Sequence, residues 1–380
     1  MHVTAFAADG FKNLHGIQFV PDPHLNLIIG DNAQGKTNLL DAIWLMTGCR
    51  SFHGVRERHY MGTDASYFRC EMRFFDGQRE QELRYMMERG NARRRSISVN
   101  GVDGAKTGGL FEIFHCIAFA PFDVELINGA PDVRRSFLDL GACQLRQGSI
   151  TRLNTAQHLL AQRNAAIQTV LHGRGRQADV SLWDAPLAQA GTAVCCMRAA
   201  YVRALSPIAA ELYGMMTGGS ETLCLSYRSA VFGTGELPDE PDAAHTEQYR
   251  TALAEGIGED MRLGHTRRGF QRDELHLTID GMPIQSFGSQ GQRKSASLVL
   301  KLAQAHLYRQ KRRMSPVVLL DDVMGELDER RQQLLYSLVE DMQVFITLCN
   351  PSSLRLDRSG SVFVMENGRL RPLGGRPALT

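Results

Sequence analysis

The chain has 380 residues, 43% of them hydrophobic and 22% charged, and a formal net charge of only +2, which suits one large or two smaller folded domains without a global basic field. No apolar run reaches the roughly 20 residues that span a bilayer, and the N-terminus has no secretory pattern, so we expect no membrane segment and a cytoplasmic location. The eight cysteines include no C-x-x-C pair, which argues against a zinc site and a disulfide framework.

Apolar periodicity and turn residues divide the chain into a strand-rich start, a helical middle and a mixed end. The predicted strands lie at 16–20, 25–29, 67–75, 116–119, 275–279, 316–320, 344–348 and 362–365, and the predicted helices lie at 38–45, within 133–215, and at 246–260, 291–312 and 328–341. We therefore expect an α/β fold in which residues 1–118 and 266–380 form one domain. A mostly helical inserted domain at 119–265 interrupts it.

The first motif joins a predicted strand to a predicted helix. Residues 30–37 read Gly-Asp-Asn-Ala-Gln-Gly-Lys-Thr, which fits the P-loop pattern G-x-x-x-x-G-K-[ST] and aims backbone amides and a helix dipole at a phosphate. Lys36 is expected to neutralise the phosphates, and the Thr37 hydroxyl to hold Mg²⁺. The alternative is a glycine-rich turn capped by Lys-Thr. The predicted nucleotide-binding residues are Gly30, Asp31, Asn32, Ala33, Gln34, Gly35, Lys36, Thr37 and Asn38.

Two acidic residues end the predicted strand at 316–320. A carboxylate at this end of a strand, beside a P-loop, is where a Walker B acid holds Mg²⁺. We expect Asp321 to be the metal ligand and Asp322 to be a catalytic residue, together with Lys36, by orienting the attacking water. The alternative is that one of the two aspartates only caps the following turn.

A second helix N-terminus follows the turn Ser289-Gln290-Gly291-Gln292. A hydroxyl and free N–H groups at such a helix end form an anion-binding site. Because one P-loop already supplies a complete phosphate cradle, we expect this second site to bind the γ-phosphate of a nucleotide held by another copy of the chain. Ser289, Gly291 and Gln292 would then complete an ATP site between two subunits. The alternative is an ordinary helix N-cap by Ser289.

These motifs, with Gly325-Glu326-Leu327-Asp328, resemble the ABC-type ATPase head shared with SMC chromosome proteins. Finer matches resemble the RecF family of bacterial DNA replication and repair proteins and run from about residue 10 to 368. They lie at 30–38, 48–52, 119–126, 131–139, 162–164 and 300–304. The resemblance implies an ABC-type (SMC-head-like) P-loop ATPase domain with a helical insertion, using ATP and Mg²⁺ in a weak, DNA-stimulated ATPase reaction near the nucleoid.

The same resemblance implies an ATP-dependent homodimer that binds double-stranded and gapped DNA and acts with RecO, RecR and RecA in recombinational repair and replication restart. Slow hydrolysis is expected, because Asp322 stands where transporter-like heads carry the longer Glu.

Two basic clusters could neutralise DNA phosphates. The alternatives are that the first cluster belongs to a solvated hairpin and that the second complements a helix C-terminus. The first cluster is Arg93, Arg94 and Arg95, and the second is Arg309, Lys311, Arg312 and Arg313.

Several positions depart from the family pattern, and they bear on hydrolysis rather than on nucleotide binding. They are Phe122 for a usual Glu, Gly325 for Ser, Phe270 and Gln271 for Pro and His, and the stretch Thr347-Leu348-Cys349-Asn350 for a usual run of threonines. The alternative is that the chain is an ABC ATPase subunit of a transporter or another SMC-like machine. A transporter subunit would carry a switch His, and a cohesin-like protein would need a long heptad arm. A scaffold that binds ATP but barely hydrolyses it is a third possibility.

Overall fold

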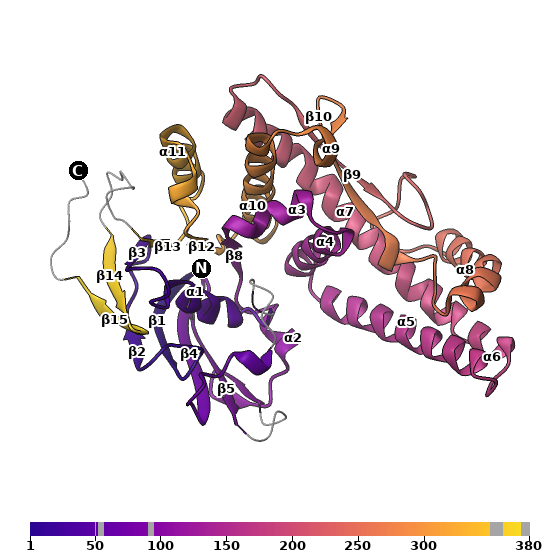
Figure 1. Cartoon of the computed structure of the whole chain (residues 1–380), viewed down its shortest axis with the longest axis horizontal. Coiled ribbons are helices and arrows are strands. Elements are labelled where there is room, and N and C mark those ends of the chain that lie inside the picture. Colours follow the sequence, from indigo (N-terminus) through magenta and orange to yellow (C-terminus); the bar gives the residue numbers. More distant parts are fainter. Residues whose placement is uncertain (50, 52–56, 90–94, 350–359, 374–380) are drawn as a thin grey trace. The chain divides into compact units, whose positions relative to one another are not determined.

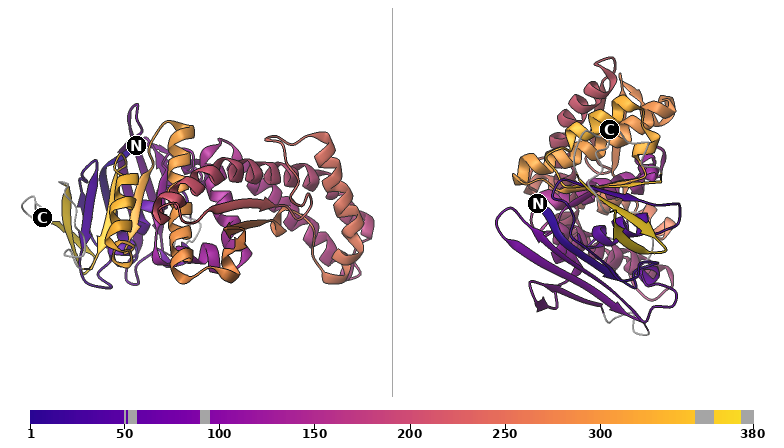
Figure 2. Two further views of the ribbon diagram at one scale, coloured as in Figure 1. Left: turned by 90° about the horizontal axis from the view of Figure 1, so that it is seen from above. Right: turned by 90° about the vertical axis from the view of Figure 1, so that its left-hand side faces the viewer.

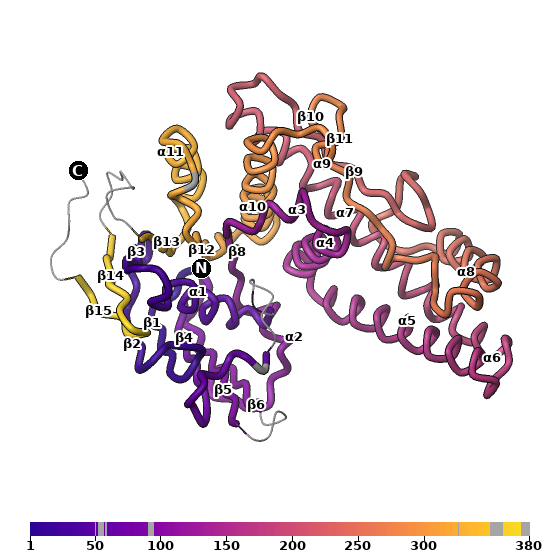
Figure 3. The backbone as a smooth tube through the Cα atoms, in the orientation of Figure 1, coloured from indigo at the N-terminus to yellow at the C-terminus, as the bar shows by residue number. Residues whose placement is uncertain are grey.

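The computed structural model describes residues 1–49, 51, 57–89, 95–349 and 360–373, and it divides into two compact units (Figure 1). Unit 1 comprises Met1–Asp123 and Gln304–Thr380, and unit 2 comprises Val124–Ala303. The predicted insertion ends at residue 265, whereas unit 2 of the structure continues to Ala303. The reason is strand pairing: residues 274–279 pair with residues 223–228 in a sheet of unit 2. Figure 3 traces the chain through these elements.

One sheet of unit 1 is mostly parallel and carries the motifs. Its strand order is β15-β14-β3-β13-β12-β8, and only the β14–β15 pair is antiparallel. The strands are β3 (Leu25–Ile29), β8 (Cys116–Phe119), β12 (Val317–Asp321), β13 (Val344–Leu348), β14 (Ser361–Glu366) and β15 (Arg369–Pro372). Every residue of β12 and β13 is buried, which explains their continuous apolar runs. Parallel strands end at one edge, so the residues after β3, β12 and β13 gather there.

The second sheet of unit 1 is antiparallel, in the order β2-β1-β4-β5-β6-β7. Its strands are β1 (His2–Asp9), β2 (Ile17–Phe19), β4 (Tyr67–Phe75), β5 (Glu80–Glu88), β6 (Arg95–Val99) and β7 (Val102–Asp103). Along β4 every second side chain is buried, as expected for a sheet with one face on a core. The ring of Phe19 lies 6.5 Å from that of Phe345 and 5.0 Å from that of Phe363, so the two sheets share this core. Figure 2 shows the strands of unit 1 in two further views.

Helices complete unit 1. They are α1 (Lys36–Leu45), α2 (Thr107–Leu110), α11 (Glu329–Leu338) and the short 3-10 segments at Glu57–His59, Pro121–Val124 and Met324–Glu326. Helix α1 contacts both β12 and β13. Its eight buried residues explain why the predicted helix at 38–45 forms directly after the P-loop.

Unit 2 consists of helices around a three-stranded sheet of order β11-β10-β9. The helices are α3 (Glu125–Asn128), α4 (Pro131–Leu145), α5 (Ser149–Leu171), α6 (Gln177–Ser181), α7 (Asp184–Thr217), α8 (Ala243–Leu263), α9 (Ile284–Phe287) and the start of α10 (Gln290–Arg312). The strands are β9 (Leu223–Arg228), β10 (Glu274–Ile279) and β11 (Met282–Pro283). Helix α7 packs against α4, α5, α8 and β9. A Cβ on Gly191 of α7 would lie 2.5 Å from the Tyr249 ring of α8, so this close crossing requires glycine.

The segment Gln177–Thr217, which contains α7, is long and apolar enough by length and composition alone to cross a membrane. This differs from the sequence expectation that no such stretch exists. In the structure 56% of its most apolar window is buried, and Arg198 of α7 is only 2% exposed among protein partners. The apolar character therefore reflects a helix that is covered by protein on several sides.

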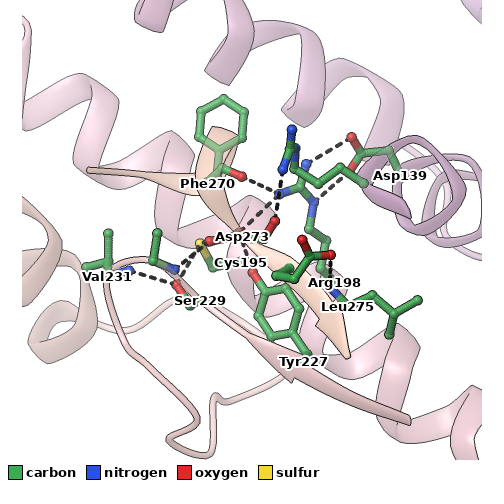
Figure 4. A network of polar contacts seen from close by, with 12 residues as sticks. Asp139, Cys195, Arg198, Tyr227, Ser229, Val231, Phe270, Asp273 and Leu275 are labelled. Atoms are coloured by element: carbon green, nitrogen blue, oxygen red, sulfur yellow. Dashed lines mark hydrogen bonds and ion pairs between the residues drawn. The ribbon is translucent and has the colours of Figure 1, made fainter. Parts of the chain in front are cut away.

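A buried ionic network ties the elements of unit 2 together (Figure 4). Arg198 pairs through Nε with Asp139 of α4 at 2.7 Å and through Nη1 with Asp273 at 3.0 Å. Asp273 precedes β10 and also accepts hydrogen bonds from the Tyr227 hydroxyl of β9 and from the Ala230 amide. Burial raises the pKa of Asp273, against the lowering effect of the Arg198 charge. Asp273 thus links the helical and sheet parts of unit 2.

Candidate functional site

The P-loop runs from the end of β3 into α1, and its backbone geometry explains why both Gly30 and Gly35 are glycine. A Cβ on Gly30 would lie 2.4 Å from the carbonyl oxygen of Met365. Gly35 has φ 114°, a value that L side chains rarely adopt, and a Cβ there would lie 2.9 Å from Asn13 Oδ1. Ala33 also has a left-handed φ, 64°. The loop therefore takes the tight path that brings backbone amides toward a phosphate.

The turn between β14 and β15 braces the P-loop. Gln34 accepts two hydrogen bonds from that turn, at its carbonyl oxygen from the Gly368 amide at 2.9 Å and at Oε1 from the Asn367 amide at 2.6 Å. At the start of α1, Asn38 donates through Nδ2 to Asn13 Oδ1 at 2.8 Å. The loop is thus held from both sides by segments of unit 1.

Lys36 points back across the loop. Its ammonium donates to the carbonyl oxygens of Gly30 at 2.6 Å and Asp31 at 2.9 Å, and its side chain is largely buried. The nitrogen also lies 3.4 Å from Cys349 Sγ, just after β13. A compact positive charge in this position is what a phosphate within the loop needs as a partner.

The two predicted metal ligands meet in the structure. The Thr37 hydroxyl donates to Asp321 Oδ1 at 2.9 Å, and the Thr347 hydroxyl donates to the same oxygen at 2.8 Å. Thr347 in turn accepts a 2.9 Å hydrogen bond from the Asp322 amide. In the part of the chain that the structure describes, no group of three or more His, Cys, Asp or Glu could hold a metal. A hydroxyl and one carboxylate beside a phosphate loop is instead the donor set that suits Mg²⁺.

Thr347 was not among the site residues predicted from the sequence, although the sequence carries a signal for it. It occupies β13, which pairs in parallel with both β12 and β3. The rule that placed Asp321 beside the P-loop, that parallel strands end at one edge, applies equally to the end of β13.

Asp322 follows β12 with a left-handed φ of 55°, and its side chain is exposed. Both of its carboxylate oxygens lie 4.0 Å from Cys349 Sγ, which itself lies 2.9 Å from Asn32 Oδ1 of the P-loop. Within the described residues these are the carboxylate contacts that the structure gives Asp322. Among the described residues, no hydrogen bond of the Asp322 side chain supports the alternative that Asp322 caps the following turn.

The Ser289 turn begins α10 in unit 2. The Ser289 amide donates to Gln292 Oε1 at 2.7 Å, and the Gln292 amide donates to Ser289 Oγ at 3.2 Å. This reciprocal pair is a capping box, so Ser289 is an N-cap as the alternative reading expected. A hydroxyl that accepts one hydrogen bond can still donate its proton, and both Ser289 and Gly291 are exposed. The cap and an anion-binding role are therefore compatible.

The basic clusters are only partly described and partly paired. Arg93 and Arg94 lie outside the described residues. Arg95 begins β6 and pairs through Nη1 with Glu57 at 2.9 Å. At the end of α10, Arg309 pairs with Asp341 at 2.9 Å, Arg312 is half-buried, and Lys311 and Arg313 are exposed.

The departures from the family pattern lie in different surroundings. Phe122 and Gln271 are in 3-10 segments, and Gln271 donates to the Thr266 carbonyl at 3.2 Å. Gly325 is exposed, and an added Cβ would meet nothing within 4 Å. Cys349, in contrast, lies directly against the P-loop and Asp322.

Comparison with known proteins gives a consistent match along nearly the whole chain. The family model of the RecF/RecN/SMC N terminal domain matches residues 2–370. A DNA replication and repair protein RecF from Heliobacterium modesticaldum is 33% identical over 376 residues, which cover 97% of this chain and 99% of that protein. The RecF of Moorella thermoacetica is 33% identical over 350 residues, which cover 91% of this chain and 90% of that protein.

Solved structures agree with the sequence matches. A structure of the recombination mediator protein RecF in the RecFOR pathway, designated RecF-ATPrS, superposes with a TM-score of 0.90 at 27% identity and covers 98% of both chains. A second, designated RecF-ATP, gives a TM-score of 0.88. An Smc head domain from Pyrococcus furiosus has a TM-score of 0.55 at 14% identity, which shows a shared fold.

Proposed function

The chain belongs to the RecF/RecN/SMC family, with RecF proteins among its relatives, and on that basis we propose that ATP joins two copies of it into a dimer that holds double-stranded DNA. The observation that carries the proposal is the 2.9 Å hydrogen bond from Thr37 to Asp321, which unites the P-loop and the Walker B strand into one phosphate and metal site. The relatives carry the name of DNA replication and repair proteins, and one solved RecF is designated RecF-ATP.

In each copy, unit 1 binds the nucleotide. The amides of residues 30–37 and the Lys36 ammonium hold the phosphates, and Thr37 and Asp321 would hold Mg²⁺. Mg²⁺, when bound, neutralises phosphate charge. Asp322, which is exposed directly after β12, orients the attacking water. Its carboxylate is one methylene shorter than that of Glu, which supports slow hydrolysis.

The second copy completes the site. Its Ser289 hydroxyl and the amides at Gly291 and Gln292 bind the γ-phosphate at the N-terminus of α10. A ligand bound across two surfaces stabilises their association by mass action. Hydrolysis removes the bridging phosphate and releases the dimer. ATP therefore acts as a dimerisation switch.

The dimer acts on double-stranded DNA and at gaps, together with RecO, RecR and RecA. The pathway designation RecFOR of the solved RecF structures supports the first two partners. Exposed Lys311 and Arg313, together with Arg93, Arg94 and Arg95, are the proposed phosphate contacts.

A scaffold that binds ATP but barely hydrolyses it is the second candidate. It is favoured by Cys349, a departure from the family pattern whose sulfur lies 4.0 Å from both carboxylate oxygens of Asp322. ATP turnover measured with and without duplex DNA separates the two functions. Stimulation by DNA supports the clamp, whereas no turnover under either condition supports the scaffold and contradicts the hydrolysis-driven release.

A further inference from the structure

The side-chain amide of Gln292 is engaged at both ends within unit 2. Its Oε1 accepts from the Ser289 amide at 2.7 Å, and its Nε2 donates to Glu221 Oε1 at 3.0 Å. Glu221 lies 71 positions away, in the connection between α7 and β9, and has no place in the sequence motifs. The Ser289 turn is therefore tied to a residue that neither its own helix nor the P-loop supplies.

Glu221 is itself held in place from the core. Its second oxygen, Oε2, accepts a 2.7 Å hydrogen bond from the hydroxyl of Tyr213, which belongs to α7 and is fully buried. The neighbouring residue Thr222 is fixed by the sheet, because its amide donates to Asp280 Oδ1 at 2.9 Å and its carbonyl accepts from the Asp280 amide at 3.0 Å. Each oxygen of the Glu221 carboxylate thus has a defined partner.

The chemistry of a carboxylate fixes the orientation of the Gln292 amide. An ionised carboxylate only accepts hydrogen bonds, whereas a primary amide has one accepting and one donating end. Nε2 must therefore face Glu221, which leaves Oε1 for the Ser289 amide. The reversed amide would set two oxygens against each other at Glu221 and two donors against each other at Ser289, and each such unmatched pair is costly.

The closed turn limits where the Ser289 proton can point. With the turn closed by Gln292, the Ser289 oxygen accepts from the Gln292 amide at 3.2 Å. The Ser289 oxygen is the acceptor in this hydrogen bond, so the Ser289 O–H proton does not point toward the Gln292 amide. That proton is directed to another acceptor. An exposed hydroxyl that donates from a helix N-terminus suits a phosphate oxygen.

We propose that Glu221 is a positioning residue for the γ-phosphate site that one copy of the chain offers to the nucleotide of another. It holds the Gln292 amide in the orientation that shapes the Ser289 turn, and Tyr213 anchors it to α7. The inference rests on the proposed function, because it gives Glu221 a role only if Ser289 contributes to an ATP-dependent dimer.

Replacing Glu221 with Ala tests the role in the full-length chain. E221A removes the acceptor for Gln292, and we expect ATP-dependent dimerisation, followed by sedimentation velocity, to weaken by about tenfold. Binding of a fluorescent ATP analogue to the monomer should remain unchanged, because the P-loop belongs to unit 1. E221Q keeps an oxygen at the position and should restore most of the dimerisation. E211A, at an exposed position of α7, is the matched control and should behave as the unsubstituted chain.

A double substitution separates positioning from a general loss of structure. If Glu221 acts through Gln292, adding E221A to a Q292A chain should cause no further loss of dimerisation. Additive losses in E221A, Q292A and the double variant would overturn the proposal, and so would dimerisation of E221A equal to that of E211A. A loss of monomer ATP binding in E221A would overturn it as well.

The variant S289R distinguishes this inference from the function on which it rests. If S289R still dimerises with ATP, the shared-site function fails. If S289R does not dimerise but E221A does so normally, the shared site stands and the role of Glu221 fails.

Discussion

Thr37 and Asp321 lie 284 positions apart in the chain, and the Thr37 hydroxyl donates a 2.9 Å hydrogen bond to Asp321 Oδ1. One residue belongs to the first turn of α1 and the other ends β12. The contact joins the two ends of the sequence across a helical insertion. It is the point at which phosphate binding and metal binding become one site.

Asp321→Ala should remove the benefit of Mg²⁺ in nucleotide binding. The carboxylate that accepts from Thr37 and Thr347 is lost, and we expect ATP affinity in the presence of Mg²⁺ to fall by about tenfold or more. Affinity in EDTA should change little, because Lys36 and the loop amides remain. Titration of the nucleotide with and without Mg²⁺ measures both quantities. A Mg²⁺ effect as large as in the unsubstituted chain would rule out Asp321 as the ligand.

Asp322→Asn should separate hydrolysis from binding. The amide keeps the size of the side chain but cannot act as a base toward water, and general-base contributions are typically about 10²- to 10⁴-fold. Phosphate release under saturating ATP should therefore fall by about a hundredfold. ATP binding and ATP-dependent dimerisation should persist. Normal turnover in this variant would refute the catalytic role of Asp322.

Bound ATP should protect Cys349 from alkylation. Its thiol is exposed and lies next to Lys36 and Asn32, so phosphates in the loop would cover it. Cys224 is also exposed but lies on β9 of unit 2, which makes it an internal control. Mass spectrometry after a timed iodoacetamide treatment should show Cys349 labelling slowed by about tenfold with ATP. Equal protection of both cysteines, or of neither, would contradict a nucleotide at this loop.

The stability of unit 1 should fall between about pH 6.5 and pH 3 through His115. Burial, and secondarily the charge of Arg312, lowers the pKa of His115 to about 3. Below about pH 6.5 the unfolded chain binds a proton at His115 that the folded chain does not bind. The stabilisation that neutral His115 gives the folded state is therefore fully present above pH 6.5, and the free energy of unfolding falls as the pH is lowered toward 3. The slope is up to about 1.4 kcal/mol per pH unit in that window.

Urea unfolding at several pH values measures this slope. H115Q should flatten the pH dependence of the unfolding free energy, because the substituted side chain does not titrate. The same substitution at exposed His158 on α5 should leave the slope as it was. An unchanged slope in H115Q would show that other groups cause the acid sensitivity.

Local patterns were enough to predict the strands and helices that carry the P-loop and Asp321, because glycine spacing, apolar runs and helix periodicity act over short distances. They were not enough to predict Glu221, which reaches Gln292 only because β9 and β10 pair in a particular register. The same pairing moved residues 266–303 into unit 2, away from the predicted boundary. Long-range register is set by packing between segments, which a single sequence does not display.

The shared ATP site is tested most directly by mixing two chains that each lack a different half of it. K36M disables the P-loop but keeps the Ser289 turn, and S289R does the reverse. In sedimentation velocity with ATP, each variant alone should remain monomeric, and the mixture should form heterodimers because one complete site is restored. ATP-dependent dimers of S289R alone, or a mixture that stays monomeric while S289R still binds ATP, would contradict a nucleotide site completed by two copies of the chain.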